Sequence, residues 1–249
     1  MKDDLGKRMK EQYESRTKYF LPRRTYTLIR LDGKAFHTFT RGMKRPYDEI
    51  FMDMMNETAM FLASEIQGCK MAYVQSDEIS LLLTDFATIT TDAWFDGQIQ
   101  KMASVSASMA AAQFNILTAL YKIQVEKKDW PDVKLAFFDS RVWTIPDPIE
   151  VENYFVWRQK DAVRNSLAMH AQSLFSHKEL HGKSQSDMHD MIHAKGENWD
   201  KLPEGFKRGR TIVKSPLSSG WTIFEPDFLK QREILSGLIP KINEDLTRD

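Results

Sequence analysis

The order in which strand-like and helix-like segments follow one another restricts the fold of this chain more than any other sequence feature. Strand-like patterns rich in β-branched and aromatic residues alternate with helical patterns whose apolar residues recur three and four positions apart. The strand-like segments are 25–31, 70–74, 79–83 and 134–145, and the helix-like segments are 51–62 and 94–125. The resulting order, β-α-β-β-α-β, predicts an α+β, ferredoxin-like domain.

The residues between these segments support the same order. Asp48 can cap the first helix, Gly68 ends it, and Pro131 stops the second helix. The polar stretch 75–78 suits a tight connection between two strands, so residues 70–83 are predicted to form a hairpin. In a ferredoxin-like sheet, the first and third strands lie side by side at the centre.

The second part of the chain, residues 146–249, carries mainly helical patterns. Helices are predicted over 151–175, 187–194 and 228–246, with an extended stretch at 211–213. No repeat and no low-complexity linker separates the two parts. The sequence therefore predicts one continuous body, in which a helical elaboration over 146–249 packs on an α+β domain over 1–145.

The charge balance and the single cysteine restrict the class of protein. Lys plus Arg and Asp plus Glu both number 35, so a polyanionic partner must be bound by a local basic face. Cys69 is the only cysteine, which excludes an internal disulfide and fits a reducing compartment. The charged N-terminus and the lack of about 18 consecutive apolar residues predict no signal peptide and no membrane span. We expect a cytoplasmic protein.

Three acidic residues stand at the ends of the predicted central strands. Asp32 follows the first strand, and Asp77 and Glu78 stand at the tip of the hairpin. Because the central strands are neighbours, these carboxylates are expected to meet. Paired carboxylates bind Mg²⁺, and two such ions can promote phosphoryl transfer, as in polymerase palm domains. Gly33 would let the backbone approach a metal or a phosphate closely.

Each of these pieces also has a plainer explanation. Asp-Gly after a strand is a common turn, and Ser-Asp-Glu is a common polar hairpin tip. On the other hand, neither GxxxxGK[ST] nor GxGxxG occurs in the chain, so P-loop and Rossmann nucleotide sites lack their motifs. A metal-dependent nucleotide site is the better-supported nucleotide hypothesis.

Five short stretches resemble motifs of one known family. IRLDGKAFHTF at 29–39 and AYVQSDEIS at 72–80 resemble the RLDG(R/K)xFHxF and A(Y/F)xQSDE(I/Y)S motifs of the tRNA-His guanylyltransferase family. FDSRV at 138–142, WRQKD at 157–161 and the LP…KRG segment at 202–209 resemble three further motifs of that family, in the same order. The resemblance spans roughly residues 5 to 215.

This resemblance implies a palm-like catalytic domain in which Asp32, the carbonyl of Gly33 and Asp77 hold two Mg²⁺ ions. Glu78 is then the adjacent acid, and Asp32, Asp77 and Glu78 are the expected catalytic residues. The implied nucleotide site comprises Asp32, Gly33, Lys34, Ala35, Phe36, His37, Ser76, Asp77 and Lys101. Lys101 is placed there by its distance from a Trp-Phe pair at 94–95.

The family reaction implied by the resemblance is nucleotide addition to the 5' end of tRNA, in the 3'-to-5' direction. ATP adenylylates a 5'-monophosphate on the tRNA, and the 3'-hydroxyl of a second nucleotide, often GTP, then attacks the activated phosphate. The resemblance also implies a homotetramer built as a dimer of dimers. The partners expected from it are tRNA and nucleoside triphosphates.

One departure from the family pattern indicates which branch of the family the chain resembles. Eukaryotic members carry HINNLYN after WRQxD, whereas VRNSLAM stands here at 163–169 and keeps only Asn165 and Leu167 in place. The missing histidine is associated with selection of the tRNA-His anticodon. The chain therefore resembles the bacterial, archaeal and phage-like branch, which completes 5'-truncated tRNAs, and repair is the expected role.

Two groups of basic residues flank the later motifs and are predicted to contact RNA phosphates. They are Arg158, Lys160, Arg164, Lys207, Arg208 and Arg210. Histidine pairs at four-residue spacing within 177–193 allow a zinc site, although a solvated helix face explains them as well. Two other functions stay open: another palm-domain enzyme, such as a nucleotide cyclase, and a non-catalytic tRNA-binding protein.

Overall fold

The computed structural model describes residues 4–125 and 135–242 of the chain. The centre of this described part is a six-stranded sheet whose neighbouring strands are antiparallel, in the order β4-β1-β3-β2-β5-β6. The strands are β1 (Tyr26–Gly33), β2 (Cys69–Gln75), β3 (Glu78–Thr84), β4 (Phe138–Ile145), β5 (Arg210–Lys214) and β6 (Trp221–Phe224). The longer helices are α1 (Leu5–Gln12), α3 (Glu49–Glu65), α4 (Ile99–Val125), α5 (Pro148–Leu174), α7 (Gln185–Ala194) and α9 (Arg232–Leu238).

The first four strands and the helices α3 and α4 follow the predicted β-α-β-β-α-β order. β1 lies between β4 and β3, and its last residues oppose the start of β3, with Asp32 across from Glu78. The prediction that the first and third strands are neighbours is confirmed. The α+β, ferredoxin-like assignment is therefore correct, and it brings the ends of β1 and of the β2–β3 hairpin together.

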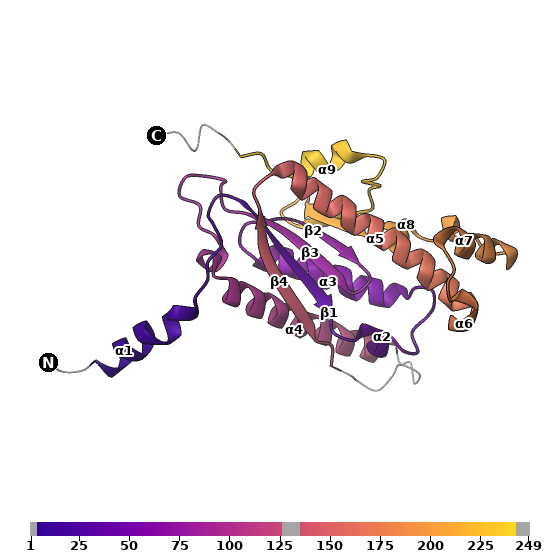
Figure 1. Ribbon diagram of the computed structural model, residues 1–249, viewed down its shortest axis with the longest axis horizontal. Helices are drawn as coiled ribbons and strands as arrows, with labels where there is room; N and C mark the ends of the chain where they lie inside the picture. The colour runs from indigo at the N-terminus through magenta and orange to yellow at the C-terminus, as the bar shows by residue number, and fades with distance from the viewer. Residues whose placement is uncertain (1–3, 126–134, 243–249) are drawn as a thin grey trace.

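Different helices cover the two faces of the sheet, with α3 and α4 on one side and α5 and α9 on the other (Figure 1). Side chains of β1 explain this division, because successive residues of a strand point to opposite faces. Ile29 and Leu31 join the core beneath α3 and α4, whereas Tyr26 and Leu28 join the core beneath α5 and α9. Arg30 and Asp32 continue the second series, so their side chains face α5.

The helix boundaries follow from capping residues. Asp48 accepts a hydrogen bond from the backbone N–H of Phe51 at 3.1 Å, as predicted for the start of α3. Asp147 caps α5 in the same way, and Pro148 occupies the first turn, where a missing N–H costs nothing. α5 therefore begins a few residues before the predicted start at 151.

The later part of the chain contributes strands as well as helices. The predicted extended stretch 211–213 is part of β5, which pairs with β2 through partners such as Ile212 and Ala72. β6 was not predicted, and it forms the edge of the sheet next to β5. The final helix is α9 alone, shorter than the predicted 228–246 because Pro240 follows it closely. Residues 243–246 of that prediction, and the predicted features at 126–134, lie outside the described residues.

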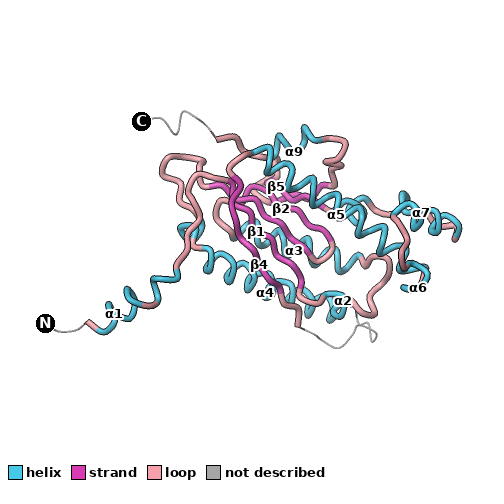
Figure 2. Tube along the Cα trace, in the orientation of Figure 1, coloured by secondary structure: helices cyan, strands magenta, loops and turns pink. Residues whose placement is uncertain are grey.

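Short helices complete the described structure and carry several site residues. They are α2 (Phe36–Phe39), α6 (His177–Leu180) and α8 (Glu204–Arg208), with the 3-10 turns η1 (Glu14–Thr17), η2 (Trp94–Gly97) and η3 (Trp199–Lys201). α1 projects away from the body near the N-terminus and has no buried residue, whereas α6 and α7 form the opposite end of the molecule (Figures 1 and 2).

α4 is the most apolar helix of the first domain. By length and composition alone, its segment Ile99–Tyr121 would be sufficient to cross a membrane. Its inner side chains, including Met102 and Phe114, instead belong to the core beneath the sheet. Its outer face leaves Ile116 and Leu120 about half exposed, so α4 presents an apolar surface to its surroundings.

Candidate functional site

Asp32 and Asp77 meet where β1 ends and the β2–β3 hairpin turns. Gln75 and Glu78 are paired across the hairpin, so Ser76 and Asp77 form a two-residue turn between them. The backbone N–H of Gly33 donates a hydrogen bond to the carbonyl of Asp77 at 3.1 Å. This bond ties the turn to the residue after Asp32, and it places the two aspartates side by side, as the sequence predicted.

The turn holds a serine in a left-handed conformation. Ser76 has a φ of 46°, a region that favours glycine because a Cβ atom crowds the backbone there. A hydrogen bond from the Ser76 side chain favours the charged form of Asp77. The residue therefore combines a strained backbone with a contact to the acid next to it.

Burial and a neighbouring negative charge raise the pKa of each aspartate. Burial, followed by the charge of Asp32, raises the pKa of Asp77 to about 6. Burial, followed by the charge of Asp139, raises the pKa of Asp32 above its ordinary value. Unlike Glu78, neither aspartate has an arginine or lysine in ion-pair contact within the described residues, so the pair concentrates negative charge at the end of the sheet.

Glu78 has a different environment, which corrects the prediction that it acts beside Asp77. Its two carboxylate oxygens accept hydrogen bonds from Nε and Nη2 of Arg158 at 2.8 and 2.7 Å. Gln75 donates a third hydrogen bond to it at 3.2 Å, and Arg30 approaches it to 4.0 Å. Only 8% of Glu78 is exposed. Because its oxygens are occupied, Glu78 clamps β3 to α5 and does not belong to the acid pair.

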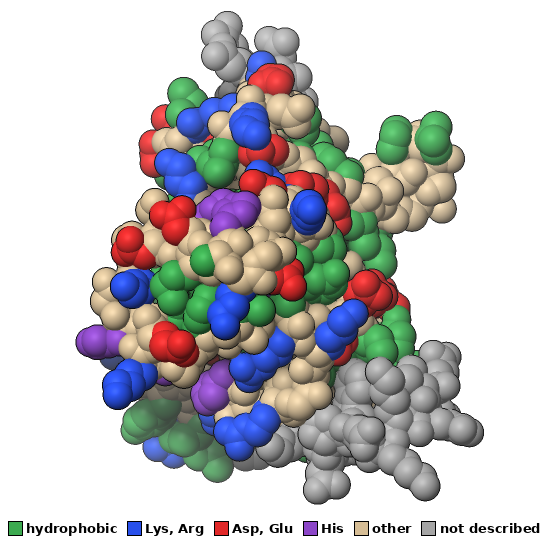
Figure 3. Space-filling view, turned by 90° about the vertical axis from the view of Figure 1, so that its right-hand side faces the viewer, with side chains coloured by type: hydrophobic (Ala, Val, Ile, Leu, Met, Phe, Trp, Pro, Cys, Tyr) green, Lys and Arg blue, Asp and Glu red, His purple; other side chains and the backbone are tan. Residues whose placement is uncertain are grey.

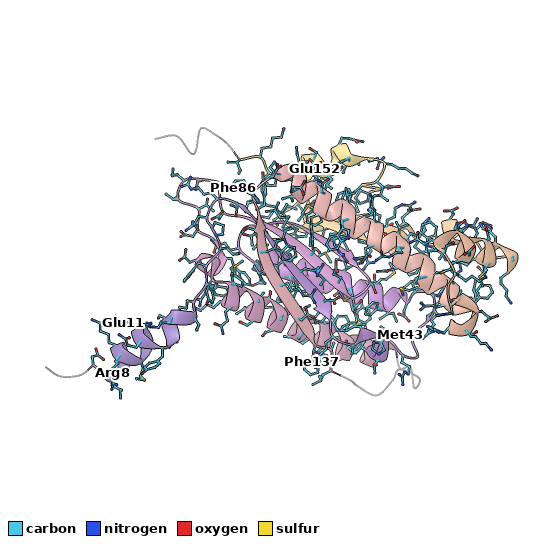
Figure 4. The ribbon with its side chains drawn as sticks, in the orientation of Figure 1. Arg8, Glu11, Met43, Phe86, Phe137 and Glu152 are labelled. Atoms are coloured by element: carbon cyan, nitrogen blue, oxygen red, sulfur yellow. The ribbon has the colours of Figure 1, made fainter. Side chains whose placement is uncertain are left out.

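A cavity of about 460 Å³ opens beside the acid pair. Six of the predicted nucleotide-binding residues line it: Gly33, Ala35, Phe36, His37, Ser76 and Asp77. Most of the remaining wall comes from the loop 40–48, from the second half of α5 and from the start of α3, with single residues from β2, α8 and β5. It includes Lys44, Tyr47, Asn165, Phe206 and Arg210. Figure 4 shows another lining residue, Met43, beside α2 at the end of the sheet where Phe137 precedes β4. The volume lies in the range of small-molecule sites.

Close packing at Gly33 explains why this position lacks a side chain. A Cβ atom there would lie 2.3 Å from the ring of Phe36, which is itself buried in the core with Phe39 and Phe114. Phe36 thus supports the cavity wall from within the core. Ala35 adopts a φ of 55° and starts α2, so the chain turns sharply around the mouth of the cavity.

Three predicted nucleotide-binding residues do not line the cavity: Asp32, Lys34 and Lys101. Lys34 is exposed and lies outside the lining. Lys101 lies on α4, whereas the side chain of Asp32 points to the opposite face of the sheet, and the Lys101 ammonium instead lies 5.7 Å from the ring centre of Phe95. The prediction that Lys101 joins this site is therefore wrong within a single chain.

Sequence reasoning missed three charged residues that border Asp32. Arg30 precedes it by two positions on the same strand face, Arg141 opposes Arg30 in β4, and Asp139 opposes Asp32. Both arginines act to lower the pKa of Asp32. The period-two alternation of β1 could have identified Arg30, and the FDSR motif contains the other two residues.

Three of the six side chains predicted to contact RNA are buried. Arg158 lies in the ion pair described above, Nζ of Lys207 donates to the carbonyl of Asp200 at 2.6 Å, and Nε of Arg210 donates to Oδ1 of Asn56 at 2.7 Å. All three are less than one tenth exposed. The prediction of RNA contact is wrong for Arg158 and Lys207, because a buried cation that is paired within the protein cannot reach an external phosphate. Arg210 instead lines the cavity, and its Nη2 has no hydrogen-bond partner among the described residues.

The other three basic residues differ in accessibility. Lys160 and Arg164 lie exposed on α5, and Arg164 forms an ion pair with Asp161. Arg208 is mostly buried and is paired with Glu204. RNA contact stays a prediction for these residues, with Lys160 the most accessible of them.

The histidines near the C-terminal helices occur as two pairs. The ring centres of His177 and His181 lie 6.3 Å apart, and those of His189 and His193 lie 4.8 Å apart. Within the described ranges, no three His, Cys, Asp or Glu side chains are grouped so that they could hold a metal. Figure 3 views this end of the molecule and shows histidines separated among acidic and basic side chains. The solvated helix face is the better interpretation.

Comparison with known proteins gives the family. The family model described as tRNAHis guanylyltransferase matches residues 6–146, which is more than half of the chain. The tRNA(His) guanylyltransferase of Schizosaccharomyces pombe is 27% identical over 252 residues, covering 94% of this chain and 91% of the yeast protein.

Solved structures agree over nearly the whole chain. A bacterial tRNA(His) guanylyltransferase-like protein in complex with ATP is 41% identical, with a TM-score of 0.87, and the match covers 96% of this chain and all of the other. A structure of such a bacterial protein with GTP is 39% identical, with a TM-score of 0.78, covering 94% and 99% of the two chains. Together with the acid pair and its cavity, these matches show that the chain belongs to the tRNA(His) guanylyltransferase family of nucleotidyltransferases.

Proposed function

We propose that this protein adds nucleotides in the 3'-to-5' direction to the 5' end of tRNA, after ATP-dependent activation of the 5'-phosphate. Its main role in this proposal is template-directed repair of tRNAs that lack 5' nucleotides. The observation that carries the proposal is the acid pair of Asp32 and Asp77 at the mouth of a cavity of about 460 Å³. Related bacterial proteins solved with ATP and with GTP support nucleoside triphosphates as its substrates.

The acid pair fits a hard divalent cation such as Mg²⁺. Burial raises the pKa of both carboxylates, and the charge of Asp32 raises that of Asp77 further, so a bound cation would stabilise their charged forms. Oxygen ligands are those that Mg²⁺ prefers. In this proposal, Asp32, Asp77 and the carbonyl of Gly33 hold two ions. Bound Mg²⁺ would supply charge neutralisation at the phosphates and activation of the attacking hydroxyl.

The proposed reaction has two phosphoryl-transfer steps. In the first, an oxygen of the tRNA 5'-monophosphate attacks the α-phosphate of ATP, and pyrophosphate leaves. In the second, the 3'-hydroxyl of an incoming nucleotide attacks the 5'-phosphate of the tRNA, loses its proton, and AMP leaves. Neither step requires covalent chemistry from the protein, so positioning and charge are its main contributions.

The surrounding residues suit these tasks. His37 and Lys44 line the cavity and can bind the phosphates of the activating nucleotide. Arg30 and Arg141 lie next to Asp32 on the opposite side and can bind further phosphates. Basic side chains on both sides of the acid pair support a reaction between two substrates that each carry phosphate.

The repair role is supported by the segment 163–169. Asn165, Ser166 and Met169 of this segment line the cavity, so its departure from the eukaryotic HINNLYN pattern changes the site itself. Loss of the histidine associated with the tRNA-His anticodon favours a substrate defined by its incomplete 5' end. Guanylate addition to tRNA-His is a compatible second activity.

The decisive test supplies the purified protein with Mg²⁺, ATP, all four nucleoside triphosphates and a 5'-monophosphorylated tRNA that lacks its first nucleotide. Gel mobility and sequencing then report the 5' end. We expect the missing, template-matched nucleotide to be restored. A wild-type protein that extends neither this tRNA nor full-length or triphosphorylated tRNA-His would overturn the proposal and favour a binding role.

The proposal includes assembly as a homotetramer, a dimer of dimers. Its support is the resemblance to the family and the apolar outer face of α4, where Ile116 and Leu120 are exposed. Light scattering coupled to size-exclusion chromatography should give four times the 29.0 kDa chain mass. An Ile116→Glu variant that remains folded and still shows the wild-type mass would exclude this face as an interface.

A further inference from the structure

We propose that Trp157 is a stacking platform for a nucleobase, on the side of the acid pair that lies away from the cavity. The inference rests on the proposed function, since it assigns a second substrate position to the same reaction centre. The ligand chemistry is an aromatic base linked to phosphate. It is supplied either by the incoming nucleoside triphosphate or by the 5'-terminal nucleotide of the tRNA.

Exposure is the first argument. Trp157 is 51% exposed, and no other tryptophan of the described residues reaches this value. A large aromatic surface in contact with water costs free energy, and a base stacked on it would recover part of that cost. Bases of nucleotides stack on such rings whatever their identity, because every base has a π face.

Rigidity is the second argument. Tyr154 packs edge-on against Trp157, with ring centres 5.9 Å apart, and the Tyr154 hydroxyl shares a 2.8 Å hydrogen bond with Ser80 of β3. The guanidinium of Arg158 lies 4.4 Å from the indole centre and is itself fixed by Glu78. The indole is therefore held from the protein side while part of its surface stays open to a ligand.

Position is the third argument. The guanidinium of Arg30 lies 5.9 Å from the indole centre, and Arg30 is two residues from Asp32 on the same face of β1. Two residues along a strand correspond to about 7 Å. Arg141 lies across from Arg30 on β4. A base on Trp157 would thus have two guanidinium groups between it and the acid pair, where its phosphates belong.

The relation to the cavity is the fourth argument. α5 contributes Ala162 and Asn165 to the cavity, whereas Trp157 lies more than one helical turn earlier and is not part of its lining. Arg158 and its partner Glu78 lie between the two. The acid pair is therefore flanked by the cavity on one side and by an exposed aromatic and basic surface on the other, which suits two different substrates.

The test uses the full-length protein and two substitutions of Trp157. Trp157→Phe keeps a stacking ring, and Trp157→Leu keeps an apolar side chain without one. Trp143→Phe is the matched control, because Trp143 packs against Tyr154 in the neighbouring core and is less exposed. Unfolding midpoints and light scattering verify that fold and assembly are unchanged in all variants.

Binding is measured by calorimetry with Mg²⁺ and a saturating, non-hydrolysable ATP analogue that occupies the cavity. The ligands are GTP, tripolyphosphate as a probe without a base, and 5'-monophosphorylated tRNA lacking its first nucleotide. We expect Trp157→Leu to weaken GTP or the tRNA by roughly 5- to 100-fold, the range for one stacked base. Trp157→Phe and Trp143→Phe should stay close to wild type, and tripolyphosphate should bind all variants equally.

The pattern of loss identifies the source of the base. A loss confined to GTP assigns the platform to the incoming nucleotide, and a loss confined to tRNA assigns it to the 5' end. Equal binding of both ligands to Trp157→Leu and wild type overturns the inference, as does an equal loss of tripolyphosphate or a change in assembly. Binding is measured directly, so the stacking role of Trp157 can hold even if the protein does not add nucleotides to the 5' end. Conversely, the stacking role can fail while the wild type still adds nucleotides.

Discussion

Two neighbouring carboxylates, Asp77 and Glu78, belong to opposite electrostatic environments. Asp77 lies in the hairpin turn beside Asp32, and its pKa is raised to about 6 by burial and by that second negative charge. Glu78 lies one residue further on, inside β3, where Arg158 binds both of its oxygens. The negative charge of Asp77 in the turn thus has no positive partner in ion-pair contact within the described residues, whereas the charge of Glu78 in the strand is neutralised by Arg158.

This difference shows that the fold uses one carboxylate for stability and leaves another available to bind a cation. An acid whose charge is balanced within the protein stabilises the contact between β3 and α5, but it cannot bind a cation as well. An acid whose charge is not balanced weakens the apo protein and keeps its oxygens available. The following predictions test this division, and they are ordered by the size of the expected effect.

Asp77→Ala should abolish nucleotide addition while the protein stays folded. Loss of a ligand to the proposed Mg²⁺ removes several kcal/mol of transition-state stabilisation, so we expect a decrease of roughly 10³-fold or more in the rate. Single-turnover addition to truncated tRNA measures it, and tRNA affinity measured by filter binding serves as the control. Substantial remaining activity would mean that Asp77 is not at the reaction centre.

Glu78→Ala should instead cost stability. It leaves the guanidinium of Arg158 buried without its main partner, and breaking a buried ion pair in this way costs about 3 kcal/mol or more. Urea unfolding followed by circular dichroism measures the free energy of unfolding. Replacing both partners, as in Glu78→Gln with Arg158→Met, should recover part of that loss. An unchanged free energy of unfolding in Glu78→Ala would refute the clamp.

Asp77→Asn should raise stability at neutral pH when no divalent metal is present. The folded-state pKa of Asp77, about 6, exceeds its ordinary value of 3.8, so the folded state binds more protons between about pH 4 and 6. Stability therefore falls as pH rises through this window, and the variant avoids a loss of about 2 to 3 kcal/mol above it. Unfolding is measured in EDTA for the wild type and for Asp77→Asn. Their free energies of unfolding should differ little at pH 4 and by the full amount at pH 7.5. Equal stability at pH 7.5 would contradict the shift.

Lys160→Gln should weaken tRNA binding only a few-fold and lower the salt dependence of affinity by about one unit of slope, as expected for one lost phosphate contact. Lys160 is exposed on α5, in contrast to the buried Arg158 next to it in the motif. Lys214→Gln is the control, because Lys214 is exposed at the end of β5 far from Asp77. Identical salt slopes for Lys160→Gln and wild type would exclude the contact.

Much of the fold was predictable because it depends on local patterns. β-branched and aromatic residues followed by Asp-Gly identified β1, and a capping residue, Asp48, placed the start of α3. The meeting of Asp32 and Asp77 followed from strand order alone. β6 was missed because its four residues give too short a pattern, and the pairing of β5 with β2 joins segments about 140 residues apart.

The site was predictable in its backbone and less so in its charges. The lining residues Gly33, Ala35, Phe36 and His37 follow the motif, but burial decides which basic residues are available. Arg158, Lys207 and Arg210 look like an RNA-binding set in sequence, but all three are buried, and each donates at least one hydrogen bond within the protein. A charge pattern alone does not distinguish a solvated cation from one that holds two elements together.

The pairing of β5 with β2 has a consequence for how the protein is made. Synthesis proceeds from the N-terminus, so β2, which leads to Asp77, is complete long before residues 210–214 emerge. Until then its outer edge carries unpaired backbone groups that can pair with other chains. Pairing with β5 covers this edge of β2, so the sheet gains protection from aggregation only when residues 210–214 have been made.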